Sequence, residues 1–104
     1  MKRGEVWWAN LPKPVGRRAV VLLSRNTAYA VRASVTVAPV TRTVHDIPVE
    51  VPLGRQDGMP ADGVINLDTI LTIPKKNLDR NLTSLAPGKL ALVERAIKFA
   101  LELH

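Results

Sequence analysis

A short apolar stretch near the N-terminus dominates the hydrophobic pattern of the chain. Five apolar residues in a row, Ala19 to Leu23, follow the pair Arg17-Arg18. A run of this length without polar alternation is typical of a strand that is buried on both faces. Arg18 would stand at the entrance of this strand, where a rigidly held guanidinium keeps its charge at any ordinary pH. The position suits a contact with phosphate, and it equally suits an arginine that only keeps the strand end in water.

The rest of the pattern predicts a series of short strands. Besides residues 18–24, strands are expected at residues 4–11, 34–41, 47–53, 63–68, 71–73 and 81–85. The short turn at residues 12–16 should pair the second strand back on the first. Prolines in the alternating stretch 47–53 cannot donate to a ladder, so this strand is expected at an edge. Pro39 likewise predicts an edge or a bulge in the strand that contains it.

Two adjacent tryptophans, Trp7 and Trp8, fall in the first strand. Neighbouring residues of a strand point to opposite faces, so at most one of the two can face a given core. The other is either a half-buried structural residue or an exposed ring on which a nucleic-acid base could stack.

A helix is expected over residues 87–103, with Pro87 at its first position. Its apolar residues cover roughly 200° of the circumference, whereas a helix that lies on one sheet needs a stripe only a little over about 100° wide. The excess indicates a second apolar contact, and we expect a homodimer whose interface includes this helix. Short strands followed by one helix predict a mainly β fold, a small curled sheet or barrel with a helix packed on it.

Length and composition indicate one globular domain. The chain has 104 residues, of which 46% are hydrophobic and 23% are charged. We therefore expect a single domain over residues 1–104 with one core. No stretch approaches the roughly 20 apolar residues that a membrane span needs, so no membrane association is expected. The absence of cysteine excludes disulfides and thiolate metal ligands and predicts a cytoplasmic location.

The charge balance changes the picture more. The net charge is +6 and the isoelectric point is about 10.3. Nine basic and four acidic residues fall among the first 60, which therefore carry five of the six net positive charges. Most of these basic residues are arginines, the side chain best suited to phosphate. A polyanionic partner such as nucleic acid is one explanation, and a solvated basic surface is the other.

Few side chains are suited to catalysis. The chain has no glycine-rich phosphate loop of standard spacing. Its only histidines are His45 and His104, and two histidines without a paired carboxylate motif argue against a catalytic metal site. His45 is either a general base or a solvated loop residue. Asp68, at a predicted strand end, is either an acid–base group or a turn cap.

Cleavage of RNA is one reaction that tolerates such a set. RNA carries its own nucleophile, the 2′-hydroxyl beside each phosphate, and an enzyme need only orient it, assist its deprotonation and stabilise charge on the phosphoryl oxygens. Arg18 suits the stabilising role, and Thr41 could hydrogen-bond a phosphoryl oxygen. DNA lacks the 2′-hydroxyl and could not be cut in this way.

Several consecutive blocks of the chain resemble one known family, the MazF/PemK toxins. The similar blocks are Arg3-Gly4-Glu5-Val6-Trp7, residues 16–24, Val37-Ala38-Pro39-Val40-Thr41, residues 63–73 and the closing helix at residues 85–103. Together they cover about residues 2–103 in the order that the family has. A single block of this kind would be weak support, but five in order are specific.

The resemblance implies an SH3-like β-barrel with a C-terminal helix that acts as a dimer. It also implies an endoribonuclease that needs neither metal nor cofactor and cuts single-stranded RNA at short sequences. The products would carry a 2′,3′-cyclic phosphate and a 5′-hydroxyl. A cognate MazE-like antitoxin would block the RNA site with an acidic, disordered tail, which fits the basic N-terminal part of this chain.

Residue by residue, the family's catalytic arginine and threonine correspond to Arg18 and Thr41. Asp68 corresponds to an aspartate that is catalytic in one plasmid-borne branch, although the arginine two positions before it in that branch is Asn66 here. Further RNA-binding residues are expected at Arg17, Arg42, Thr43 and Asn66. Two departures concern the substrate groove: Ala19 replaces the usual proline, and the loop at residues 12–17 is shorter than is common in the family.

Three other functions are compatible with the residues. A nucleic-acid-binding module without chemistry would need Arg18 but not Thr41. A gyrase-poisoning toxin of the CcdB type would share the fold class, but such toxins depend on a tryptophan near the C-terminus, whereas this chain ends Glu102-Leu103-His104. A folded toxin that has lost its activity would show the same sequence pattern.

Overall fold

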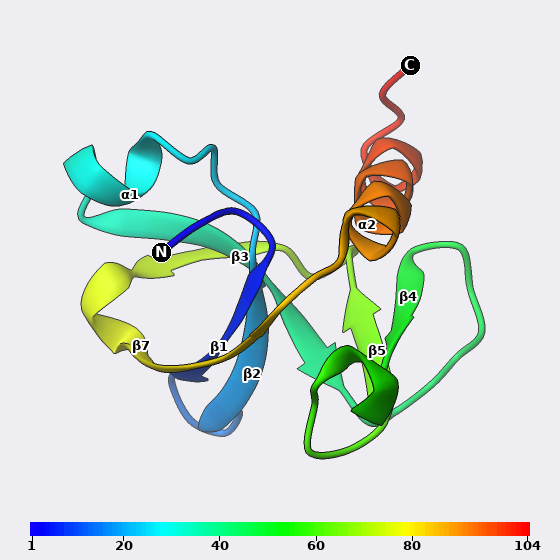
Figure 1. Cartoon of the computed structure of the whole chain (residues 1–104), viewed down its shortest axis with the longest axis horizontal. Helices are drawn as coiled ribbons and strands as arrows, with labels where there is room; N and C mark the ends of the chain where they lie inside the picture. The colour runs from blue at the N-terminus through cyan, green and yellow to red at the C-terminus, as the bar shows by residue number, and fades with distance from the viewer.

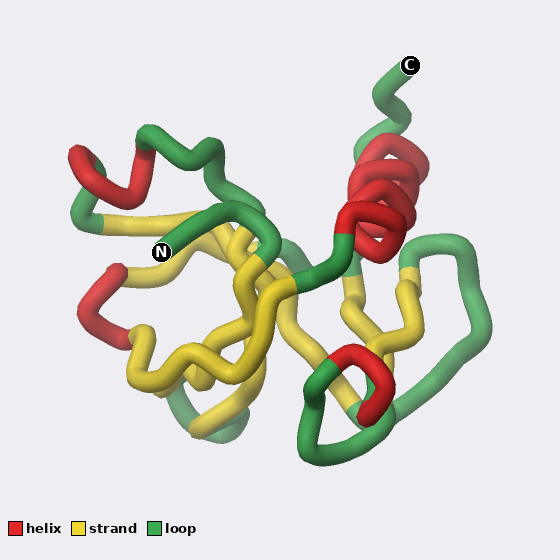
Figure 2. The backbone as a smooth tube through the Cα atoms, in the orientation of Figure 1, coloured by secondary structure: helices red, strands yellow, loops and turns green.

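Strand β3 runs through the middle of a seven-stranded antiparallel sheet (Figures 1 and 2). The computed structural model describes all residues, 1–104. Its strands are β1 (Glu5–Asn10), β2 (Arg17–Leu22), β3 (Ser34–Thr41), β4 (Glu50–Leu53), β5 (Gly63–Asn66), β6 (Leu71–Pro74) and β7 (Leu78–Ser84). Its helices are α1 (Ala28–Val31) and α2 (Pro87–Ala100), with 3-10 turns η1 (Arg55–Asp57) and η2 (Lys75–Asn77).

The sheet has the order β4-β5-β3-β2-β1-β7, and β6 also pairs with β3. On the side away from β2, strand β3 changes partner along its length: residues 34–37 pair with β6, and Val40 and Thr41 pair with β5. The path ends at β4 and β7, which do not pair with each other, so the curled sheet is not closed. The predicted mainly β fold with a C-terminal helix is confirmed, including the return of the second strand on the first.

Strand β2 is buried on both faces, as its apolar run predicts. Val21 packs in one core cluster together with Val6, Ile65 and Val93 of α2. Its neighbour Val20 packs in a second cluster, formed largely by residues of β2 and β3. The tryptophans divide in the same way and are both half-buried: Trp8 lies against the first cluster and Trp7 against the second.

Two expectations about the strands need correction. Pro39 lies at neither an edge nor a bulge but inside β3, opposite Val20 of β2. On its other side it falls between the residues paired with β6 and those paired with β5, so its missing N–H interrupts no ladder pairing there. The expected edge strand at residues 47–53 is confirmed as β4, although it begins only at Glu50.

Helix α1 lies between the expected strands at residues 18–24 and 34–41, where the sequence predicts neither a helix nor a strand. It has four residues and no side-chain cap. The Tyr29 hydroxyl donates to the carbonyl of Ser24 at 2.9 Å, and Lys75 Nζ donates to the carbonyl of Tyr29 at 2.7 Å. Burial raises the pKa of Tyr29 to about 12. The burial of Tyr29 and the hydrogen bond from Lys75 therefore hold α1 in place, because four residues are too few for a stable isolated helix.

Helix α2 covers the first core cluster, on the opposite side of the molecule from α1 (Figure 1). Val93 and Ala96 are buried, whereas Phe99 remains 61% exposed and Leu92 42% exposed. The helix thus has more apolar surface than the sheet covers, as its sequence predicts. No helix of the structure is long and apolar enough to cross a membrane.

Gly63 lets β5 approach β3 closely. A Cβ added to Gly63 would lie 2.5 Å from the backbone oxygen of Thr41, closer than real Cβ contacts. Because the obstacle is backbone, the two strands would have to separate.

We predict that Gly63→Ala lowers the free energy of unfolding in urea by about 1–3 kcal/mol, the usual cost of overpacking. Gly88→Ala is the matched control, because no atom lies within 4 Å of a Cβ there, and helical Gly→Ala is neutral or favourable by up to about 1 kcal/mol. A Gly63→Ala protein as stable as the wild type would show that the approach of the strands is not constrained.

Candidate functional site

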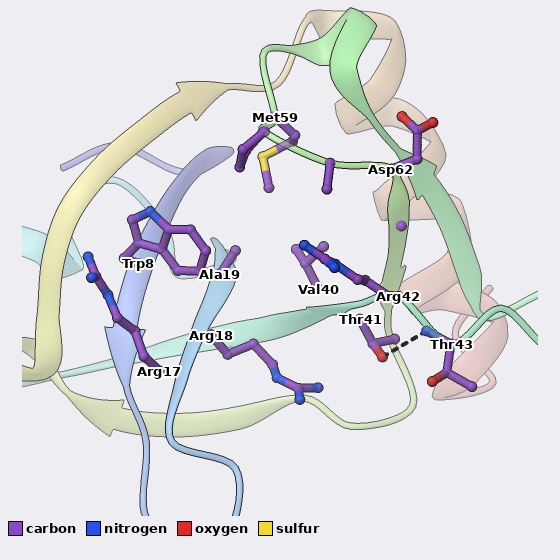
Figure 3. A pocket seen from close by; sticks show the side chains of 13 residues that line it. Trp8, Arg17, Arg18, Ala19, Val40, Thr41, Arg42, Thr43, Met59 and Asp62 are labelled. Atoms are coloured by element: carbon purple, nitrogen blue, oxygen red, sulfur yellow. Dashed lines mark hydrogen bonds between the residues drawn. The ribbon is translucent and has the colours of Figure 1, made fainter.

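A pocket of about 370 Å³ lies where β2 begins and β3 ends (Figure 3). Four segments line it: β1, the start of β2, the end of β3 with the residues after it, and the loop before β5. The lining residues are Trp8, Arg17, Arg18, Ala19, Val40, Thr41, Arg42, Thr43, Met59, Pro60, Ala61, Asp62 and Gly63.

The pairing of β2 with β3 brings Arg18 and Thr41 to the same part of this pocket. Val20 pairs with Pro39, and the register continued by two residues sets Arg18 opposite Thr41. Opposed residues of antiparallel strands point to the same face. Figure 3 shows the Arg18 side chain extending toward Thr41.

Hydrogen bonding leaves both side chains available to a ligand. The Thr41 hydroxyl oxygen accepts the backbone N–H of Thr43 at 3.2 Å, so its own proton is free to be donated. Arg18 takes part in no ion pair and is only partly exposed. A guanidinium with unused donors in a half-buried position is well placed to bind a phosphate in two-pronged fashion.

The lining is electropositive. It contains three arginines, Arg17, Arg18 and Arg42, against one acidic residue, Asp62. Asp62 Oδ1 already accepts the backbone N–H of Arg55 at 3.0 Å, and Figure 3 shows its carboxylate directed away from the arginines. The pocket therefore favours an anion.

Five of the seven site residues predicted from the sequence line this pocket. They are Arg17, Arg18, Thr41, Arg42 and Thr43.

The other two, Asn66 and Asp68, do not line it. Asn66 ends β5 at the end opposite Gly63, which is roughly 10 Å along the strand at about 3.3 Å per residue. Its side-chain oxygen accepts the backbone N–H of Asp68 at 2.8 Å, and Asp68 is exposed in the turn that follows. Both residues therefore lie outside the pocket that contains Arg18 and Thr41, and their roles stay predictions.

His45 also lies outside the pocket. Its backbone N–H donates to Glu50 Oε1 at 2.9 Å, and its side chain is exposed in the loop before β4. No group of three or more His, Cys, Asp or Glu side chains in the structure could hold a metal ion.

One wall of the pocket was not assigned to the site by sequence reasoning. Residues 59–62 lie between two expected strands, Gly63 begins the expected strand at residues 63–68, and Met59 is buried. The Thr83 hydroxyl donates to the carbonyl of Asp57 at 3.0 Å, and Lys89 Nζ lies 3.6 Å from the Asp57 carboxylate. An isolated methionine in a polar turn is the only local sign that this segment folds back on the core.

Comparison with known proteins agrees with this fold. The chain is 34% identical over 101 residues to the probable endoribonuclease MazF5 of Mycobacterium tuberculosis, covering 96% of this chain and 92% of that protein. The solved Mycobacterium tuberculosis toxin MazF-mt6 superposes with a TM-score of 0.89 and 30% identity, covering 96% of this chain and 98% of the other. A solved endoribonuclease in complex with its cognate antitoxin, from a mycobacterial species, aligns with a TM-score of 0.90 and 28% identity, covering 100% and 97% of the two chains.

The family match extends over nearly the whole chain, which confirms the resemblance carried by the sequence blocks. Residues 2–101 match the description "PemK-like, MazF-like toxin of type II toxin-antitoxin system". The chain therefore belongs to the family of PemK-like, MazF-like toxins of type II toxin–antitoxin systems.

Proposed function

We propose that the pocket at Arg18 and Thr41 is the active site of an endoribonuclease that cuts single-stranded RNA without a metal ion. The observation that carries the proposal is the free guanidinium of Arg18 beside a threonine whose hydroxyl proton is also free. Relatives of this chain are named endoribonucleases, which supports the same activity. The arginine and threonine donors of the lining suit direct contact with phosphate. The single carboxylate of the pocket, that of Asp62, already accepts a backbone hydrogen bond.

The proposed reaction uses the RNA's own 2′-oxygen. This oxygen attacks the adjacent phosphorus, the bond from phosphorus to the 5′-oxygen breaks, and a 2′,3′-cyclic phosphate and a 5′-hydroxyl result. The 2′-proton is lost to a base, and the leaving 5′-oxygen takes up a proton. Negative charge grows on the phosphoryl oxygens between these events, and stabilisation of that charge at a preorganised site lowers the barrier.

Arg18 is assigned the role of charge stabiliser. An arginine pKa of about 12.5–13.8 makes the side chain a poor base at neutral pH. Thr41 donates its hydroxyl proton to a phosphoryl oxygen and thereby positions the phosphate. The pocket arginines Arg17 and Arg42 hold the neighbouring backbone phosphates.

The same basic pocket is the proposed target of a cognate antitoxin. A solved mycobacterial endoribonuclease of similar fold is described in complex with its cognate antitoxin. An acidic, disordered tail would meet three arginines here and would compete with RNA for them.

We also propose that the toxin acts as a homodimer through α2. Leu92 and Phe99 are exposed on this helix and line an apolar groove of about 270 Å³ between α2 and β4. A large exposed apolar patch on a small protein marks an interaction surface.

Cleavage of a long single-stranded RNA in EDTA tests the active site. We expect discrete cuts with cyclic-phosphate ends by the wild type, and a fall in kcat of about 10²–10³ for Arg18→Ala, the usual effect of removing one charge-stabilising donor. Thr41→Ala should lose less, because a neutral hydrogen bond is worth about 0.5–1.5 kcal/mol against about 1.5–3 for one to a charged group.

Arg32→Ala is the matched control, since it removes the same charge from an exposed position. Arg32 lies just before the first residue of β3, whereas Thr41 is the last residue of that strand. An equal fall in kcat in Arg18→Ala and Arg32→Ala would show that the effect comes from the overall charge of the protein and not from a specific role of Arg18. Binding of RNA without any cuts would favour a nucleic-acid-binding module or a toxin without activity.

The oligomeric state tests the dimer. We expect the wild type to sediment as a dimer at micromolar concentration and Phe99→Glu to sediment as a monomer, because a buried, unpaired carboxylate opposes association. Ala91→Glu places the same group on the polar side of α2 and should leave the dimer intact. A monomeric wild type would contradict the proposal.

A further inference from the structure

Arg17 is the one arginine of the pocket whose guanidinium contacts other side chains of the protein. Its Nη2 lies 3.1 Å from Asp79 Oδ2, and its Cζ lies 5.0 Å from the centroid of the Trp8 ring. The side chains of Arg17 and Asp79 are 51% and 44% exposed. A guanidinium over an indole face at this distance is a cation–π contact.

The arrangement is built by the strand register around Trp8. On one side Trp8 pairs with Ala19 of β2, and Arg17, two residues earlier in β2, therefore lies diagonally on the same face. On the other side the pairing with β7 is irregular: Ala9 pairs with Leu78 and Trp8 with Arg80, so Asp79 has no partner in β1. A bulge redirects the side chain of the extra residue, and here Asp79 reaches Arg17.

This contact occupies a face of the only aromatic ring in the pocket. Figure 3 shows Trp8 and Arg17 on the side of the pocket away from Thr41, with Arg18 between. A nucleotide whose phosphate lies at Arg18 can therefore bring a neighbouring base to Trp8. Nucleobases and guanidinium groups are both planar and stack on aromatic rings in the same way.

We propose that Trp8 is a stacking platform for a nucleobase, and that Arg17 with Asp79 keeps this platform covered until RNA binds. When RNA binds, a backbone phosphate replaces Asp79 as the partner of Arg17, and a base replaces the guanidinium on the ring. The exchange is favourable because a half-exposed ion pair contributes little, whereas a phosphate offers the guanidinium a bidentate partner. The inference deepens the proposed ribonuclease function, on which it rests.

The two tryptophans provide a selective measurement. Trp7 lies against the other core cluster, and its indole N–H donates to Glu5 Oε1 at 2.9 Å. In a Trp7→Phe protein, Trp8 is the only tryptophan, so its fluorescence reports on the platform alone.

The probes are a hexamer of 2′-O-methyl adenylate, which the proposed reaction cannot cut, and an abasic hexamer with the same number of phosphates. Anisotropy of a 5′ dye gives the occupancy of each. At equal occupancy we expect the adenylate hexamer to quench Trp8 strongly and the abasic hexamer to leave most of the signal. Equal quenching of Trp8 fluorescence by the two hexamers would contradict the proposal that a base stacks on Trp8. An unchanged Trp8 fluorescence at full occupancy by the adenylate hexamer would contradict it as well.

A double-mutant cycle tests the role of Asp79. Asp79→Asn should tighten binding of the adenylate hexamer about two- to fivefold, the range that a surface ion pair can supply. In an Arg17→Gln background the same change should have a smaller effect, because Asp79 acts through Arg17. Glu102→Gln, which removes a carboxylate at the end of α2, is the control for net charge. Equal effects of Asp79→Asn in both backgrounds would overturn the coupling.

Kinetics separate this inference from the active site itself. Trp8→Leu should raise KM with kcat changed little, and Trp8→Phe should restore KM, whereas Arg18→Ala should lower kcat. If Trp8→Leu cuts RNA with unchanged KM, the platform is wrong and the ribonuclease stands. If the wild type cuts no RNA, the proposed ribonuclease activity is wrong. Quenching by the adenylate hexamer but not by the abasic hexamer would then still show that a base stacks on Trp8.

Discussion

The burial of β2 on both faces is the constraint on which the rest of the structure depends. Val20, Val21 and Leu22 have no exposed surface, so any shift of this strand by one residue would exchange the contents of two cores. The strand is thereby fixed between β1 and β3. Arg18 stands two residues before Val20 and inherits that fixed position. A catalytic group gains from such rigidity, because its geometry does not have to be assembled when the substrate binds.

The pocket arginines differ in what they contact, and this difference suggests a division of labour. Arg18 has no protein partner and is ready for the reacting phosphate. Arg17 is paired with Asp79 and covers Trp8, so it must exchange partners before it can serve the substrate. Both follow from adjacent positions in one strand, which point to opposite faces. The start of β2 can thus supply both a charge stabiliser and a cover for a base-binding surface.

Much of this arrangement could be predicted from local sequence pattern. The strand over residues 34–41, the apolar run of β2 and the excess apolar face of α2 follow from periodicity. Arg18 and Thr41 are assigned to one site by the family resemblance, whereas the strand register that sets them opposite each other comes from the structure. The position of Asn66 and Asp68 outside the pocket has a clear origin. Asn66 ends the strand that begins at the pocket, and Asp68 lies in the turn after it. Which end of a strand meets a site is decided by topology and not by local pattern.

Other parts of the site depend on contacts between distant residues and gave no such signal. The bulge at Asp79 arises where β7 meets β1, and the turn that leads to the wall at residues 59–63 is held at Asp57 by Thr83 and Lys89. Helix α1 is held by the burial of its own Tyr29 and by the hydrogen bond from Lys75, because four residues are too few to form a stable helix on their own. These features form only when the sheet has brought residues that are distant in the sequence into contact.

The central claim is that the RNA supplies the nucleophile and the pocket stabilises the charge. It is tested most directly by replacing one 2′-hydroxyl with hydrogen at a mapped cleavage position and incubating this RNA with the wild-type protein in EDTA. The account predicts that the substituted bond is no longer cut, while unmodified bonds in the same molecule are cut as before. Cleavage of the substituted bond at an undiminished rate would contradict it.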